Sequence, residues 1–69
     1  MIKVDEIKNT DYDENTYWVS AFADTKAEVV PGAVFVGLPK NAKLEMGSKV
    51  LTADGHLALM RSDGVWSWH

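Results

Sequence analysis

The chain has 69 residues and no cysteine, and its 7 Lys and Arg against 10 Asp and Glu give a formal net charge of −3. A disulfide scaffold and a cysteine-liganded zinc site are therefore excluded. The acidic balance argues against a nucleic-acid partner, because binding to the phosphate backbone depends on Lys and Arg. No apolar stretch approaches the roughly 20 residues that span a bilayer, and no basic segment followed by an apolar run marks a secretion signal, so we expect no membrane partner.

The length indicates one small domain, residues 1–69. Hydrophobic residues make up 46% of the chain, which argues against a disordered tail. A chain this short buries only about 60% of its unfolded surface, and ordering each residue costs about 1.5 kcal/mol. We therefore expect part of the apolar surface to be covered by a partner, either a copy of the same chain, with a trimer as one option, or a larger assembly.

The segment from Met1 to Lys8 begins with the alternation of a strand, because Ile2 and Val4 share one face. Ile7 breaks this phase, which predicts a β-bulge or a short helical turn near Asp5–Lys8. The polar segment from Asn9 to Asn15 is typical of a turn.

Part of that turn resembles the start of a calcium loop, with oxygen-bearing side chains at the first, third and fifth positions of 11–15. An EF-hand requires Gly at the sixth position and Glu at the twelfth, where this chain has Thr16 and Phe22. We therefore expect a solvated turn and no metal site.

The segment from Thr16 to Ala23 is rich in β-branched and aromatic residues and predicts a strand. Large apolar side chains occur on both of its faces, with Val19 on one and Trp18 and Phe22 on the other, so we expect both faces to be covered. The polar segment 24–28 predicts a loop, with a single helical turn as the alternative.

Pro31-Gly32 is a strong turn signal. The apolar run from Ala33 to Leu38 follows, and its six residues are short for a helix and suited to a buried strand. Gly37 within this run indicates a bulge or a close approach of another backbone.

The last third predicts three strands: Lys49 to Thr52, Leu57 to Arg61, and Val65 to Trp68. Asp54-Gly55 and Asp63-Gly64 separate them, and Asp-Gly between apolar runs is typical of hairpin turns. The whole chain therefore predicts an all-β fold, a small antiparallel meander or barrel-like domain of about five strands.

Catalytic and metal-binding patterns are missing from the sequence. His56 and His69 are isolated, without metal-ligand spacing, and no serine lies in a nucleophile elbow. We expect no enzymatic activity and no cofactor. Trp66 and Trp68 lie two apart and so share one face of a strand. They indicate either a stacking platform for a ligand or internal packing.

The C-terminal third resembles a hairpin motif of tailed-phage structural proteins. The resemblance lies in Gly47-Ser48, the apolar strand up to Thr52, the Asp54-Gly55 turn, the second strand ending at Leu59-Met60, and Asp63-Gly64-Val65-Trp66. Ile7 to Thr10 and Asp24-Thr25-Lys26 are similar to short reading frames among virion genes of phages and prophages. The resemblance implies a virion structural protein without enzymatic activity, made in the cytoplasm of a bacterial host.

Such a protein would be a capsid decoration, head-fibre or tail-associated subunit. It would contact copies of itself and a capsid, portal or tail protein. We predict that its contact residues are apolar side chains of the central run and the last two strands: Val34, Phe35, Val36, Leu57, Leu59, Trp66 and Trp68.

Two other functions remain open from the sequence. A ligand-binding module would use Trp66, Trp68 and Tyr17 to stack on glycans. A regulatory protein that mimics nucleic acid fits less well, because a net charge of −3 over 69 residues produces too weak a field.

Overall fold

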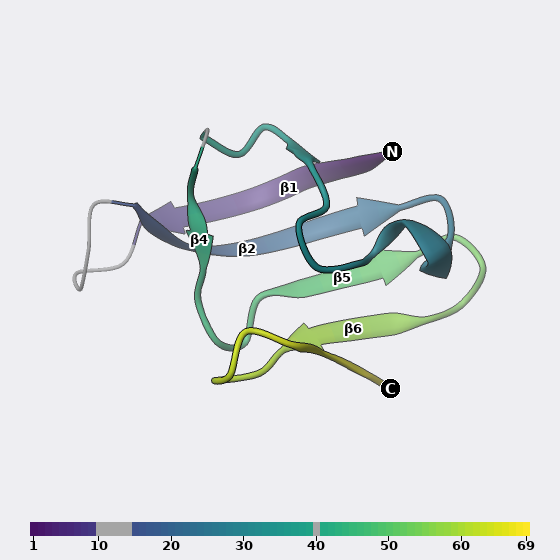
Figure 1. Ribbon diagram of the computed structural model, residues 1–69. Helices are drawn as coiled ribbons and strands as arrows, with labels where there is room; N and C mark the ends of the chain where they lie inside the picture. Colours follow the sequence, from purple (N-terminus) through teal and green to yellow (C-terminus); the bar gives the residue numbers. More distant parts are fainter. Residues whose placement is uncertain (10–14, 40) are drawn as a thin grey trace.

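Figure 1 shows a computed structural model of the chain, which describes residues 1–9, 15–39 and 41–69. The calcium-like segment falls mostly on residues 10–14, outside the described residues. The fold begins with two long strands, β1 (Ile2–Asn9) and β2 (Thr16–Ala23), which pair antiparallel. Their register shifts between Val4 and Glu6, so the bulge predicted near Asp5–Lys8 is confirmed.

The chain next crosses one face of the sheet. A single 3-10 turn, η1 (Lys26–Glu28), follows β2, so the structure adopts the helical-turn alternative for this segment. Two short strands, β3 (Phe35–Val36) and β4 (Lys43–Leu44), pair parallel with β1 and β2, respectively. In Figure 1 this teal-to-green part of the chain passes in front of β1 and β2.

The buried strand predicted over Ala33–Leu38 is wrong in length, because only Phe35 and Val36 pair with a neighbour. The Leu38 N–H donates to the Phe35 carbonyl at 3.3 Å, which closes a turn directly after the strand. Gly37 lies in this turn with φ of +99°, and a Cβ there would lie 3.4 Å from Val4 Cβ. This neighbour is a side-chain atom at an ordinary van der Waals distance, so the positive φ of the turn accounts for Gly37, and the indicated bulge or close backbone approach stays a prediction.

The C-terminal meander is confirmed. Strands β5 (Lys49–Thr52), β6 (Leu57–Met60) and β7 (Trp66–Trp68) pair antiparallel in sequence. The Thr52 N–H donates to the His56 carbonyl at 2.8 Å across the first turn, and the Arg61 N–H donates to the Val65 carbonyl at 3.0 Å across the second.

The all-β class is confirmed, whereas the expected arrangement needs correction. The seven strands form one open, mixed sheet in the order β3-β1-β2-β5-β6-β7, with β4 beside β2, where we expected about five strands in an antiparallel, barrel-like domain. The difference arises at β2 and β5, which run parallel. Residues 24–48, which we call the crossing segment, connect β2 to β5. A connection of this length lets the second strand run in the same direction as the first.

Alternation along the strands gives the sheet two different faces. The covered face carries small and medium apolar side chains, with Val19 and Val50 fully buried, and the crossing segment adds Val29 and Phe35. The opposite face, which we call the outer face, has two rows of residues in register across the strands. The first row is Val36, Lys3, Phe22, Leu51 and Leu57, and the second is Glu6, Ser20, Lys49, Leu59 and Ser67.

The expectation that both faces of β2 are covered is wrong. Phe22 is 41% exposed and Leu51 is 51% exposed, because the part of the crossing segment that packs on the sheet lies on the other face.

Candidate functional site

The seven predicted contact residues do not form one surface. Phe35, Trp66 and Trp68 lie on the covered face and pack against the core. Leu57 and Leu59 are half-buried on the outer face of β6. Val36 lies on the same face at the opposite side of the sheet, on β3 in register with Lys3, with β1, β2 and β5 between it and the two leucines. Val34 lies on the crossing segment and is 83% exposed.

The two C-terminal tryptophans are partly buried and pack against the core. The Trp66 ring stacks on Phe35, with ring centroids 6.1 Å apart and planes 17° from parallel. The Trp68 ring has the Lys26 ammonium 4.9 Å from its centroid and His56 edge-on at 6.2 Å. Phe35 therefore covers one face of the Trp66 ring, and Lys26 and His56 contact the Trp68 ring.

An apolar groove lies on the covered side of the sheet, between the crossing segment and the β6–β7 turn. It encloses about 540 Å³, and its lining includes Phe35, Leu38, Leu44, Met60 and Trp66. Trp68 and Tyr17 do not line it, so the three residues predicted to stack on a glycan are not brought into one site.

A second hollow lies on the outer face, above β2 and β5. It encloses about 310 Å³. Its lining comes from four strands: Asp5 of β1, Ser20, Ala21 and Phe22 of β2, Lys49 and Leu51 of β5, and Leu57 of β6. Among the described residues, neither the Asp5 carboxylate nor the Lys49 ammonium has an ion-pair partner. Exposed apolar side chains thus lie beside charged groups of both signs on the outer face.

Sequence reasoning did not single out Phe22, Leu51, Asp5 and Lys49, which line the hollow of the outer face. The signal was present in the alternation along 16–23, which puts Trp18 and Phe22 on the face opposite to Val19. What the sequence did not reveal was that only one face of this strand is covered.

The outer face ends at Trp18, which is fixed by two contacts. Its Nε1–H donates to the Gly47 carbonyl at 3.0 Å, and the Lys8 ammonium lies 5.5 Å from the ring centroid. This indole joins β2 to the corner that leads into β5, and it lies on the outer face beyond the second row, in register with Lys8.

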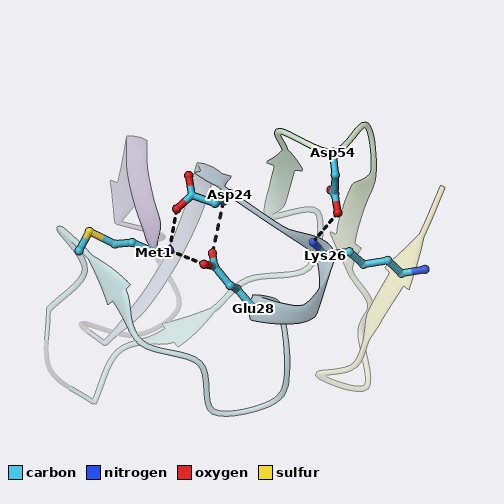
Figure 2. A network of polar contacts seen from close by, with 5 residues as sticks. All are labelled: Met1, Asp24, Lys26, Glu28 and Asp54. Atoms are coloured by element: carbon cyan, nitrogen blue, oxygen red, sulfur yellow. Dashed lines mark hydrogen bonds and ion pairs between the residues drawn. The ribbon is translucent and has the colours of Figure 1, made fainter.

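A network of polar contacts holds the 3-10 turn against the ends of the strands (Figure 2). The Met1 α-ammonium donates to Glu28 Oε1 at 2.5 Å and to Asp24 Oδ2 at 3.1 Å. Hydrogen bonding to Glu28, followed by that to Asp24, raises the pKa of this amine above its usual 8.0.

At the other end of the 3-10 turn, Asp54 Oδ2 accepts a hydrogen bond from the Lys26 N–H at 3.2 Å. The Thr52 hydroxyl donates to Asp54 Oδ1. These bonds stabilise the carboxylate and lower the pKa of Asp54 below its usual 3.8, with the Thr52 bond as the larger cause. The network connects the crossing segment to the β5–β6 turn, so its role is structural.

Neither histidine belongs to a cluster of possible metal ligands. His56 packs against Trp68, and His69 is exposed. Over residues 1–9, 15–39 and 41–69, no three His, Asp or Glu side chains lie close enough to hold a metal ion. Within the same ranges the chain forms no helix of the length and apolar character needed to cross a bilayer.

Comparisons of the chain with protein-family models, with curated proteins and with solved structures found no match. The phage resemblance of the C-terminal motif therefore stays a prediction from the sequence.

Proposed function

We propose that this protein acts by protein–protein assembly through the outer face of its sheet, as a structural or accessory subunit of a phage particle without enzymatic activity. The observation that supports assembly is the uncovered apolar row of the outer face. Phe22 and Leu51 are 41% and 51% exposed and lie in register on the neighbouring strands β2 and β5. Val36, which is 48% exposed, lies in the same row on β3, on the other side of Lys3 of β1. Exposed apolar side chains gathered on one face of a small protein are typical of an interaction surface.

The phage part of the proposal is supported by the sequence motif. Its residues make up the corner before β5 and the β5-β6-β7 meander. Gly47 and Ser48, with which the motif begins, connect this meander to β2 through Trp18 Nε1 and the Val19 N–H. A subunit of this kind would be made in the bacterial cytoplasm and carried in the virion, in contact with a capsid, portal or tail protein.

Mass spectrometry of phage particles purified from the source culture tests the proposal. We expect the chain to band with the particles at a fixed ratio to the major capsid protein. A chain that is abundant in the lysate but absent from the banded particles would overturn the virion assignment.

Two matched variants test the surface. Leu51→Lys puts a charge in the apolar row of the outer face, whereas Val34→Lys puts the same charge on an exposed position of the crossing segment. We expect the first variant to be lost from particles and the second to be retained. Equal retention of both folded variants would show that assembly does not use the outer face.

A second function, binding of a small apolar or sugar ligand, is favoured by one observation: Trp66 and Phe35 line the 540 Å³ groove. A glycan array with the folded chain tests it. Binding that is lost in Trp66→Ala at an unchanged circular-dichroism spectrum would favour this function over assembly.

A further inference from the structure

We propose that the outer face binds a second copy of this chain, giving a face-to-face dimer whose two-fold axis runs along β2. This inference rests on the proposed function, since it names the first partner of the same surface. In the sheet, β1 and β5 lie on either side of β2, and β3 and β6 lie next beyond them. The two-fold axis therefore puts β2 over the partner's β2, β1 over the partner's β5, and β3 over the partner's β6.

The first row of the outer face is nearly self-complementary about β2. Read across the sheet, it is Val36, Lys3, Phe22, Leu51 and Leu57. The two-fold axis reverses this order, so Phe22 meets Phe22 and Val36 meets Leu57. Lys3 meets Leu51, where its methylene stem covers the leucine while the ammonium reaches solvent.

The second row supplies complementary charge. Glu6 on β1 and Lys49 on β5 lie in register with Ser20 on β2, one strand to each side. The bulge places Asp5 beside Glu6, and Asp5 lines the same hollow as Lys49. The two-fold axis brings the acidic pair of one copy against Lys49 of the other, and it does so twice. Small Ser20 lies between the two contacts and leaves room for the close approach of the sheets.

The face is close in size to a standard interface. The two longer extents of the Cα trace, 33 and 22 Å, bound an area of about 730 Å², and standard interfaces bury about 800 Å² per partner. The first row lies toward the end of the sheet at which β1 begins and β2 ends.

Light scattering coupled to size-exclusion chromatography on the full chain is the first test. At a concentration on the order of 100 μM we expect a mass of twice 7.7 kDa. Phe22→Lys should give the monomer mass with an unchanged circular-dichroism spectrum, and Val34→Lys should leave the dimer intact. A wild-type chain that stays monomeric at this concentration overturns the proposal.

Charge reversal tests the symmetry itself. Lys49→Glu alone puts a third carboxylate against the acidic pair of the other copy, and the double variant Asp5→Lys/Glu6→Lys puts two ammonium groups against Lys49. Each variant alone should dimerise at least about tenfold more weakly than wild type. An equal mixture of the two should recover the dimer, because opposite charges then meet across the interface. Failure of the mixture to recover it would overturn the proposed axis.

These outcomes are separable from the proposed function. A chain that is monomeric in solution but present in purified particles refutes the dimer and leaves the assembly function standing. A chain that dimerises through the outer face but is absent from particles supports the dimer and refutes the virion assignment.

Discussion

Ser48 provides the sharpest test of how the mixed sheet is held together. One side of β2 pairs with β4 at Thr16 and Tyr17 and with β5 from Ser20 onward, so Val19 falls in the gap between the two partners. Val19 is fully buried, and its N–H donates to Ser48 Oγ at 3.1 Å. A side-chain hydroxyl therefore replaces the missing backbone acceptor.

The Ser48→Ala substitution removes this acceptor and leaves a buried N–H unpaired. Such a loss costs about 1–3 kcal/mol, a large share of the roughly 3–10 kcal/mol that stabilises a domain of this length. Urea denaturation measures the loss, and hydrogen exchange at the Val19 amide locates it. Ser62→Ala, in an exposed turn, is the matched control and should change stability by less than about 0.5 kcal/mol. A Ser48→Ala variant as stable as the control, with Val19 still protected, would refute the reasoning.

Three further predictions concern β5 and the turns at its ends. Val50→Ala should lower the free energy of unfolding in urea by about 2–3 kcal/mol, whereas Leu51→Ala should lower it by less than about 1 kcal/mol, because Val50 is fully buried and Leu51 is half exposed. Similar losses of stability in the two variants would contradict the assignment of Val50 to the covered face and Leu51 to the outer face. The stability difference between wild type and Asp54→Asn should be constant above pH 3.8 and shrink below it, because the hydrogen bonds that lower the pKa of Asp54 stabilise only its ionised form. A difference independent of pH would argue against these hydrogen bonds to Asp54. Gly47→Ala should cost about 1–2 kcal/mol in thermal denaturation, because Gly47 has φ of +92°; an unchanged melting temperature would count against a strained corner.

The parts of the fold that the sequence predicted correctly are those set by local signals. Two Asp-Gly turns between apolar runs fixed the β5-β6-β7 meander, because turn type and alternation together determine register in a hairpin. The bulge in β1 was also a local signal, because Ile7 is out of phase with the alternation of Ile2 and Val4.

The parts that the sequence did not predict depend on contacts between distant residues. The parallel pairing of β2 with β5 joins residues almost thirty positions apart, such as Ser20 and Lys49. Strand β4 is only two residues long, Lys43 and Leu44, and carries no recognisable alternation. The predicted contact residues fall on two faces of the sheet for a similar reason. The path of the crossing segment decides which face is covered, and this path depends on contacts between residues far apart in the sequence.

The composition of the covered face explains why the outer face is left open. Three alanines, Ala21, Ala23 and Ala58, lie in the middle of the core, and the large aromatic rings of Phe35 and Trp66 lie around it. Small central side chains let the crossing segment, with Val29 and Phe35, lie close to the sheet. One segment is enough to cover one face at this distance, and the described chain has no second segment of that length. The larger apolar groups, Phe22 and Leu51, therefore face outward, where a second sheet can pack about 10 Å away.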